Sequence, residues 1–314
     1  MSTKVLVVDI HAEMYRDRLQ AEFPSLQFLL FKDGSEVSGD LSDVGVMIMF
    51  GIEIRDEMLA GAPKLKWIQS LATGVDHFLR CPSLKPGVLI TSGRGIHGPP
   101  MREEVVYLMM GVSRDARRQA EDHQHHIWQR RQWSTLHGKT AVVVGTGIIG
   151  EAIGELLQAF GMRTIGVTRT PRKIAGFDEV MPQAQLAEAA AKADYLINIL
   201  PASDDNTGLF GVKIFGAMKP SAYYISAGRG QTVDEDALLE ALTERRIAGA
   251  GLDVFHAEPL PPESPFWRLP NVFITPHIGG YVIEYEDFIM PLIVENMRLF
   301  LAGRSSQMQN IVPR

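Results

Sequence analysis

A glycine-rich turn between a buried strand and a helix constrains the fold of this chain more than any other feature. The apolar segment 141–144 is followed directly by Gly145-Thr146-Gly147-Ile148-Ile149-Gly150, and apolar residues then recur at helical spacing as far as Phe160. In this setting the glycines permit a tight turn, a close approach of a pyrophosphate and close packing of the helix on the strand. The motif therefore predicts a dinucleotide-binding unit, although the glycines alone would also fit a purely structural turn.

Strands alternate with helices on both sides of this motif, which indicates parallel sheets covered by helices on both faces. In the first hundred residues, strands are predicted at 5–8, 27–31, 46–50, 67–71 and 88–91, with helices at 14–23 and 55–60. In the second half, strands are predicted at 141–144, 164–167, 195–199, 222–225, 250–254 and 272–275. Two longer helices are predicted, one from Met101 to about Arg118 with a polar continuation to Trp133, and a final one from about Val282 to Phe300.

The segment 93–100, Gly-Arg-Gly-Ile-His-Gly-Pro-Pro, is rich in turn formers and predicts a junction between two domains. No strand is predicted after the last helix, so this helix is free to pack back on the first domain. We expect two doubly wound α/β domains with a cleft between them. Residues 1–100 and 283–314 would form a flavodoxin-like substrate domain, and residues 101–282 a Rossmann-type dinucleotide-binding domain.

The charge balance argues against a nucleic-acid partner, because 31 Lys and Arg against 37 Asp and Glu give a net charge of −6. The single cysteine, Cys81, cannot form an intramolecular disulfide, which fits a reducing compartment. The N-terminus runs straight into a predicted strand, and no apolar stretch approaches the roughly 18 residues of a membrane span. We therefore expect a cytoplasmic protein that binds no membrane. No metal site is expected, because His123, His125 and His126 lack supporting carboxylates or cysteines.

The residues after the second strand of a dinucleotide unit select the cofactor, since an acidic residue there binds the ribose 2′-hydroxyl of NAD. This chain has Thr168 at that point, followed by Arg169-Thr170-Pro171-Arg172-Lys173, and no carboxylate. Hydroxyl groups and cations suit a 2′-phosphate. The sequence therefore predicts NADP(H) in preference to NAD(H), with Arg169 as the main contact. A solvated basic surface loop is the alternative interpretation.

One arginine, one glutamate and one histidine each follow a predicted strand of the second half. Arg229 follows 222–225, Glu258 follows 250–254 and His277 follows 272–275. A capping-box pattern at 232–235 predicts that a helix begins soon after Arg229. Because the carboxyl ends of parallel strands meet at one edge of a sheet, the three side chains are expected to converge there. A cation, a carboxylate and an imidazole beside a nicotinamide can bind a 2-oxo acid and protonate its carbonyl oxygen.

These residues and several others resemble the D-isomer-specific 2-hydroxyacid dehydrogenase family from about Trp67 to His277. Besides 145–150, the matching segments are Leu71-Ala72-Thr73-Gly74-Val75-Asp76-His77, Leu200-Pro201 with Thr207, Gly228-Arg229-Gly230, Gly251-Leu252-Asp253-Val254, Glu258-Pro259-Leu260 and Thr275-Pro276-His277. Within the family, Thr168-Arg169-Thr170 and the run from Glu258 to Trp267 look most like the glyoxylate/hydroxypyruvate reductases. The segment 101–104 resembles the helix opening of that branch, except that Glu104 stands where an aromatic residue is more usual.

The resemblance implies reduction of a small 2-oxo acid to the D-2-hydroxy acid, with His277 as the acid/base, Glu258 as its carboxylate partner and Arg229 as the substrate clamp. Asp253 would shape the site near the cofactor. The implied substrate site comprises Leu71, Ala72, Thr73 and Gly74, through their backbone amides, with Arg229 and His277. The implied cofactor site comprises Gly145, Gly147, Ile148, Ile149, Gly150, Thr168, Arg169, Thr170, Leu200, Pro201, Thr207, Ala227, Gly228, Arg229, Asp253, His277 and Gly279. Family members commonly dimerise through the cofactor domain, so a homodimer is expected.

Other functions remain open from the sequence. A non-catalytic protein of this fold that senses NADP(H) could retain all three catalytic residues, and a reductase of larger 2-oxo acids would also carry them. Formate dehydrogenases are disfavoured, because such chains have Gln in place of Glu258. A phosphoglycerate dehydrogenase usually has the ribose-binding acid that this chain lacks, and often a regulatory extension.

Overall fold

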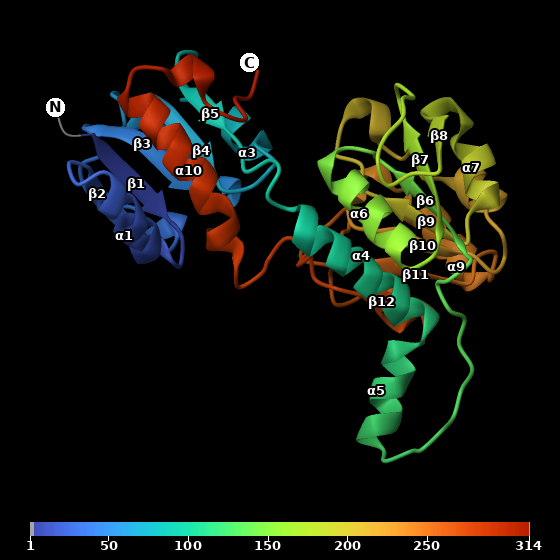
Figure 1. The fold of residues 1–314 in the computed structure, drawn as a ribbon. Helices are drawn as coiled ribbons and strands as arrows, with labels where there is room; N and C mark the ends of the chain where they lie inside the picture. The colour runs from blue at the N-terminus through green and yellow to red at the C-terminus, as the bar shows by residue number, and fades with distance from the viewer. Residues whose placement is uncertain (1–2, 314) are drawn as a thin grey trace. The chain divides into compact units, whose positions relative to one another are not determined.

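A computed structural model describes residues 3–313, which divide into two compact units (Figure 1). The first unit runs up to Ile96 and resumes at Ile283, and the second runs from His97 to Val282. Each unit is built on one parallel sheet, so the expected fold class of two parallel-sheet α/β units is confirmed. Among residues 3–313, no helix combines the length and the apolar character needed to cross a membrane.

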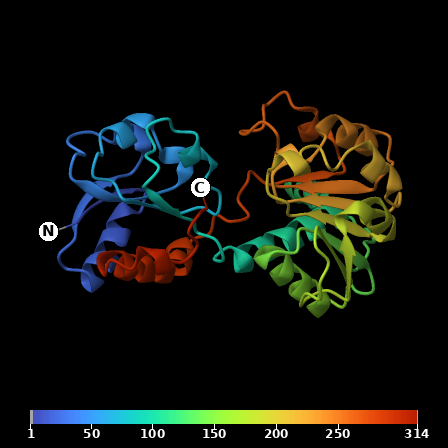
Figure 2. The same cartoon turned by 90° about the horizontal axis from the view of Figure 1, so that it is seen from above.

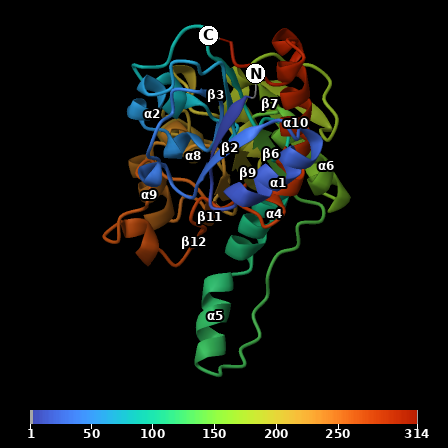
Figure 3. The ribbon, with the colours of Figure 1, turned by 90° about the vertical axis from the view of Figure 1, so that its left-hand side faces the viewer.

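The first unit contains a five-stranded parallel sheet in the order β2-β1-β3-β4-β5. Its strands are β1 (Lys4–Val8), β2 (Gln27–Phe31), β3 (Val44–Met49), β4 (Trp67–Ser70) and β5 (Leu89–Thr91). The side chains of Val5 to Val8 are fully buried, so both faces of the sheet are covered. Figure 3 shows α1 (Ala12–Glu22) and α10 (Tyr285–Leu301) on one side of this sheet and α2 (Asp56–Ala60) on the other. A short helix, α3 (Asp76–Leu79), follows β4.

Buried polar contacts attach the C-terminal helix α10 to the first sheet. Asn296 is fully buried; its amide nitrogen lies 3.3 Å from the Oε1 atom of Gln69, and its oxygen accepts the N–H of Gln309 at 2.7 Å. The ring of Phe300 lies 5.4 Å from that of Trp67, centroid to centroid. Because a buried amide that loses its partners costs about 1–3 kcal/mol, these bonds fix where α10 lies on the sheet.

The second unit contains a seven-stranded parallel sheet in the order β12-β11-β10-β9-β6-β7-β8. Its strands are β6 (Thr140–Val144), β7 (Arg163–Thr168), β8 (Glu179–Pro182), β9 (Tyr195–Asn198), β10 (Tyr223–Ser226), β11 (Gly249–Leu252) and β12 (Val272–Ile274). Helices α4 (Gly98–Ser113) and α6 (Ile148–Ala159) cover one face, and α7 (Leu186–Lys192), α8 (Val212–Ala217) and α9 (Glu235–Thr243) cover the other (Figure 2). Val142 packs in one apolar core and its neighbour Val143 in the other, as expected for a strand buried on both faces.

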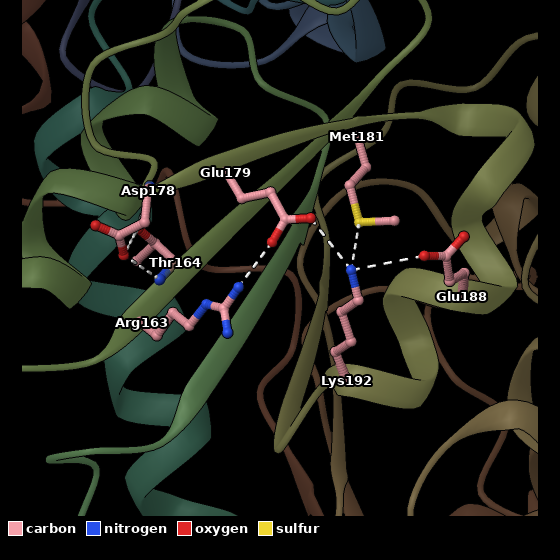
Figure 4. A network of polar contacts seen from close by, with 7 residues as sticks. All are labelled: Arg163, Thr164, Asp178, Glu179, Met181, Glu188 and Lys192. Atoms are coloured by element: carbon pink, nitrogen blue, oxygen red, sulfur yellow. Dashed lines mark hydrogen bonds and ion pairs between the residues drawn. The ribbon is translucent and has the colours of Figure 1, made fainter.

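The edge strand β8 is not predicted from the sequence, because its four residues, Glu-Val-Met-Pro, form no apolar run. Side-chain contacts hold it instead (Figure 4). Glu179 accepts hydrogen bonds from Arg163 of β7 at 2.8 Å and from Lys192 of α7 at 3.1 Å. The pKa of Glu179 lies below its ordinary value, mainly because Lys192 hydrogen-bonds to the carboxylate. These contacts secure the strand next to β7, whose carboxyl end carries Thr168.

The prediction of one long helix from Met101 to about Arg118 is wrong in its last part. Helix α4 ends at Ser113, and α5 (Ala116–Gln124) is a separate helix (Figure 1). Asp115 between them has a left-handed backbone with φ of 53°, and its carboxylate accepts the N–H of Arg118 as the N-cap of α5. The polar continuation predicted to Trp133 is helical only to Gln124, and 127–135 have no regular structure.

The helix predicted after Arg229 forms, but a different residue caps it. Helix α9 begins at Glu235, and its N-cap is Asp234, whose carboxylate accepts the N–H of Ala237 at 3.0 Å. Thr232, the expected capping residue, instead donates its hydroxyl to the carbonyl of Arg229 at 2.7 Å. The capping-box pattern therefore predicted the wrong N-cap residue for this helix. Thr232 instead stabilises the loop that carries Arg229.

Candidate active site

Three neighbouring strands of the second sheet bring the predicted catalytic residues to one edge. Strands β10, β11 and β12 pair in parallel, with Ser226, Leu252 and Ile274 at the same level of the register. Arg229 follows β10, Glu258 lies on the connection between β11 and β12, and His277 follows β12. All three therefore start from the carboxyl edge of the sheet, where open α/β sheets bind their ligands.

His277 and Glu258 form a direct contact at this edge. The Nδ1 atom of His277 lies 2.7 Å from Oε2 of Glu258, and Oε1 of Glu258 accepts the N–H of Phe255 at 2.9 Å. The two side chains are 43% and 35% exposed, so both meet solvent. A carboxylate on Nδ1 fixes the orientation of the ring and leaves Nε2 to exchange a proton with a ligand.

Asp253, at the end of β11, orders the loop that carries His277. Its carbonyl accepts the N–H of His277 at 2.9 Å, and its carboxylate accepts the N–H groups of Ile278 at 2.9 Å and Gly279 at 3.2 Å. His277 has a left-handed backbone with φ of 55°, which few residues other than glycine adopt. The three bonds to Asp253 hold this conformation and therefore set the direction in which the imidazole points.

A buried polar network holds the loop of Arg229. Asn198, at the end of β9, is fully buried, and its amide nitrogen lies 2.7 Å from the hydroxyl of Thr232 and 3.3 Å from that of Ser226. Thr232 in turn donates to the carbonyl of Arg229. The guanidinium of Arg229 donates to the carbonyl of Gly228 at 2.8 Å, and its side chain is half-buried. Arg229 is thus a positioned cation on the same edge as the His277–Glu258 pair.

The glycine-rich turn has the geometry that its motif predicts. Gly145 has φ of 106°, and a Cβ at this position would lie 3.1 Å from the carbonyl oxygen of Ile199. A Cβ at Gly150 would overlap the carbonyl of Gly145. By contrast, a Cβ at Gly147, the N-cap of α6, would meet no atom within 4 Å. The turn is closely packed on its protein side and open in front of the helix N-terminus, where the amides can receive a phosphate; Ile148 and Ile149 open the helix there.

The predicted 2′-phosphate residues lie at the end of β7. Thr168 is the last residue of that strand and is half-buried, whereas Arg169 and Thr170 are exposed. The guanidinium of Arg169 lies 3.4 Å from the carboxylate of Asp205, and these side chains are 71% and 76% exposed. The sequence did not point to Asp205, because this residue follows β9 and carries no motif of its own.

The remaining predicted cofactor residues follow β9 and β10. Leu200 and Pro201 come directly after β9, and Thr207 donates its hydroxyl to the carbonyl of Ser203 at 3.0 Å. The loops after the two strands touch, because a Cβ at Gly228 would lie 2.5 Å from the carbonyl oxygen of Leu200. Ala227 is buried and continues the pairing, donating its N–H to Asn198. These loops lie beside the glycine-rich turn, since Gly145 approaches Ile199.

The predicted substrate loop, Leu71 to Gly74, belongs to the first unit and follows β4. The N–H of Leu71 donates to the carbonyl of Met49 at 2.9 Å, and the N–H of Ala72 donates to the hydroxyl of Ser70 at 3.2 Å. The carbonyl of Leu71 accepts the hydroxyl of Tyr285. Two of the amides expected to hold the substrate carboxylate therefore already have acceptors, the amide of Leu71 on β3 and that of Ala72 at the end of β4. The substrate role of 71–74, Thr73 included, stays a prediction.

A buried cluster behind the His277 loop joins Asp253, which was predicted from the sequence, to Glu104 and Thr275, which were not part of the predicted site. Glu104 of α4 is 9% exposed, and its Oε1 atom lies 2.6 Å from the hydroxyl of Thr275, which lies 2.7 Å from the carboxylate of Asp253. The one signal in the sequence was the acidic residue at position 104 where the resemblance favours an aromatic one. Only the fold brings α4 against the ends of β11 and β12.

A family model matches residues 106–279, and its description is D-isomer specific 2-hydroxyacid dehydrogenase, NAD binding domain. Glyoxylate/hydroxypyruvate reductase A of Serratia proteamaculans is 33% identical over 257 residues, which cover 79% of this chain and 81% of that protein. The chain spans about half the length of the mycobacterial D-3-phosphoglycerate dehydrogenases that it also matches, at 29% identity and 52% of their length.

Solved structures share the whole fold. A D-isomer specific 2-hydroxyacid dehydrogenase family protein from Aeromonas salmonicida superposes with a TM-score of 0.91 at 32% identity, covering 100% of this chain and 99% of that one. An NADPH-dependent glyoxylate/hydroxypyruvate reductase from Sinorhizobium meliloti, solved with NADP and sulfate, superposes with a TM-score of 0.84 at 27% identity, covering 99% and 98%. The resemblance to this family and to its glyoxylate/hydroxypyruvate reductases is confirmed.

The His277–Glu258 pair makes stability depend on pH in a defined direction. Burial raises the pKa of Glu258, but the hydrogen bonds from His277 and Phe255 and the charge of Arg229 lower it to below its ordinary value. Its contribution to stability is therefore complete above the unfolded-state pKa, about 4.3, and is lost as the pH falls through the lower native value.

We expect Glu258→Gln to unfold more readily than the wild type near neutral pH, by no more than about 1 kcal/mol, because solvent screens the partly exposed pair. The two proteins should converge as the pH falls below about 4. Urea unfolding at several pH values measures this difference. An equal loss of stability at every pH would show that packing, and not the charge of Glu258, is responsible.

Proposed function

The chain belongs to the D-isomer specific 2-hydroxyacid dehydrogenase family, and we propose that it uses NADPH to reduce a small 2-oxo acid to the D-2-hydroxy acid. Acids of the glyoxylate and hydroxypyruvate class are the substrates that we propose. The observation that carries this function is the His277–Glu258 contact of 2.7 Å on the sheet edge that also bears Arg229. The likeness to glyoxylate/hydroxypyruvate reductases supports the substrate class.

Each catalytic residue has one task in this reaction. Arg229, a permanent cation, binds the anionic substrate and draws electron density from its carbonyl group. Reduced nicotinamide, when bound, supplies the hydride that adds to the carbonyl carbon. His277 donates the proton of Nε2 to the carbonyl oxygen, so that the C=O group becomes a hydroxyl, and the ring then regains a proton from water. Glu258 stabilises the charged imidazole and keeps Nε2 aimed at the substrate.

The residues around the glycine-rich turn suit a dinucleotide that carries a 2′-phosphate. The turn is open in front of Gly147, where the helix amides can receive the pyrophosphate. At the end of β7, Thr168 and Thr170 offer hydroxyl groups and Arg169 offers a guanidinium. The contact of Arg169 with Asp205 is long and exposed, so exchanging this carboxylate for a phosphate costs little. These features support NADP(H) in preference to NAD(H).

A protein that senses NADP(H) without catalysis is the alternative that the cofactor residues alone would support. The hydrogen bond between Glu258 and His277 favours catalysis, because orienting an imidazole with a carboxylate serves proton transfer and is not needed for nucleotide binding. A reductase of larger 2-oxo acids would use the same residues and differ only in its substrate preference.

The segment after α5 supports a homodimer through the second unit. Trp128 is 94% exposed and Ile127 is 49% exposed, and both lie on the segment that leads from α5 to β6. The neighbouring Trp133 is 51% exposed, and the guanidinium carbon of Arg114 lies 3.5 Å from its ring centroid. Aromatic and arginine side chains gathered on an exposed segment are typical of subunit interfaces. We infer that a second copy of the chain covers Trp128.

We expect NADPH oxidation with glyoxylate and hydroxypyruvate to exceed that with pyruvate or a bulky aryl 2-oxo acid. His277→Gln should lower kcat for reduction about 100- to 10,000-fold, a larger change than in NADPH affinity, since the proton donor is lost. Initial rates and fluorescence titration with NADPH measure the two quantities, and the control is His256→Gln, which alters an exposed histidine on the connection that carries Glu258. NADPH binding without turnover of any acid would favour the sensor.

Arg169→Ala should raise KM for NADPH about tenfold or more and leave KM for NADH unchanged, because a charge-assisted hydrogen bond contributes roughly 1.5–3 kcal/mol. Steady-state rates at varied cofactor concentration measure both constants. Arg246→Ala removes a surface arginine that follows α9, outside the proposed cofactor site, and serves as the control. Equal changes with NADPH and NADH would contradict a specific contact with the 2′-phosphate.

Trp128→Glu should shift the protein from dimer to monomer at micromolar concentration, because a charge at the centre of an apolar contact is desolvated without a partner. Sedimentation equilibrium measures the association constant. Ile283→Glu alters an equally exposed apolar residue, 94% exposed, of the first unit and should leave the dimer intact. A monomeric wild type, or an unchanged dimer in Trp128→Glu, would exclude this interface.

A further inference from the structure

Three buried oxygen-bearing side chains form a row behind the loop of His277. Glu104 projects from α4, Thr275 follows β12 and Asp253 follows β11, and they are 9%, 4% and 2% exposed. The hydroxyl oxygen of Thr275 lies 2.6 Å from Oε1 of Glu104 and 2.7 Å from Oδ1 of Asp253. Both distances are those of short O–H···O hydrogen bonds.

The number of protons in this row is limited. A threonine hydroxyl has one proton to donate, and an ionised carboxylate has none. If Glu104 and Asp253 were both ionised, one of the two short contacts would join oxygen lone pairs with no proton between them. One of the two carboxyl groups must therefore hold a proton and donate it to Thr275, which then donates its own proton to the other carboxylate.

The surroundings identify Glu104 as the group that holds the proton. The carboxylate of Asp253 accepts two backbone N–H groups, those of Ile278 and Gly279, which favour its charged form. Burial raises the pKa of Glu104, and the negative charge of Asp253 raises it too, against the opposing effect of the bond to Thr275. The charged group that faces Glu104 is Asp253, which follows β11, and the residue after β12 that contacts it is the neutral Thr275.

We infer that Glu104 is a positioning residue that stays protonated near neutral pH, and that the chain Glu104–Thr275–Asp253 holds the loop of the catalytic His277. The effect on catalysis rests on the proposed function, whereas the protonation and the hydrogen bonds do not. Neither residue 104 nor residue 275 touches the reacting atoms in this proposal; both act through Asp253.

The His277 loop lies close enough to Glu104 for these hydrogen bonds to affect the conformation of the loop. A Cβ at Gly279 would lie 3.0 Å from Cγ of Glu104 and 3.2 Å from Oδ2 of Asp253, so the loop backbone packs directly on both side chains. The Asp253 carboxylate fixes the amides of Ile278 and Gly279, the two residues after His277. Any shift of this carboxylate moves the backbone of His277, which is held at φ of 55°.

If Glu104 lost its proton, the carboxylates of Glu104 and Asp253 would compete for the single hydroxyl proton of Thr275. Only one of them could then be hydrogen-bonded to Thr275, and the two negative charges would repel each other in a buried place. We expect the loop to loosen at alkaline pH for this reason. Reduction would then fall as Glu104 loses its proton.

Infrared spectroscopy tests the protonation directly. At neutral pH the wild type should show the carbonyl stretching band of a buried carboxylic acid, and Glu104→Gln should lack it. Glu103→Gln, which alters the exposed neighbour on the same helix, should keep the band. Hydrogen exchange of the amides of 275–281 measures the loop without requiring activity, and it should speed up in the wild type as the band disappears at alkaline pH.

Kinetics test the positioning role. Glu104→Gln keeps a donor for Thr275 and should match the wild-type kcat at neutral pH while losing the alkaline ionisation that belongs to Glu104. Glu104→Leu removes the donor and should lower kcat about 10- to 100-fold, more than it changes KM, because the imidazole is misplaced. A wild type without the acid band, or a Glu104→Leu enzyme with wild-type kcat and loop exchange, would overturn the inference. If the protein has no reductase activity, the infrared and hydrogen-exchange results are still expected. Failure of the proposed function can therefore be distinguished from failure of this inference.

Discussion

The parallel pairing of β10, β11 and β12 is the constraint on which the rest of the candidate site depends. The register aligns Ser226, Leu252 and Ile274, so the loops that follow leave the sheet at the same height. Each loop then continues the pairing for one more residue, since Asp253 donates its N–H to Ser226 and Thr275 donates its N–H to Leu252. A one-residue slip between β11 and β12 would move His277 relative to Glu258, and a slip between β10 and β11 would move Arg229 relative to both. The geometry of the candidate site is therefore set first by the backbone hydrogen bonds of the sheet.

Small residues in β11 and α4 bring the helix close enough to take part in the site. A Cβ at Gly251 of β11 would lie 2.9 Å from Cβ of Leu108, and one at Gly249 would lie 3.0 Å from a methyl group of Val112. On the helix side, a Cβ at Gly111 would overlap the ring of Phe273 on β12. Larger side chains at these positions would lift α4 off the sheet and withdraw Glu104 from Thr275. The same close packing that fills one apolar core thus places a carboxyl group behind the His277 loop.

Sequence patterns predicted the features that depend on strand order and local spacing. They did not predict features that depend on the backbone angle of a single residue or on a contact between distant segments. The strand ends and the glycine-rich turn were sufficient to expect Arg229, Glu258 and His277 on one edge, because parallel strands leave little choice. The division of α4 from α5 depends on the left-handed backbone of Asp115, which the apolar periodicity does not reveal. Strand β8 is held by charged side chains, and Asp205 meets Arg169 only because the loops after β7 and β9 are neighbours in the fold.

The charge state around His277 follows from three different environments for three carboxyl groups. Glu258 is partly exposed, and although burial raises its pKa, the hydrogen bonds from His277 and Phe255 and the charge of Arg229 lower this pKa to below its ordinary value. Asp253 is buried, but backbone amides compensate its charge. Glu104 is buried and shares the hydroxyl of Thr275 with Asp253, and in our proposal it keeps its proton in this contact. An aromatic residue at position 104 would fill the space without a titratable group. With Glu104 at this buried position, our proposal makes the conformation of the His277 loop depend on whether the carboxyl group holds a proton.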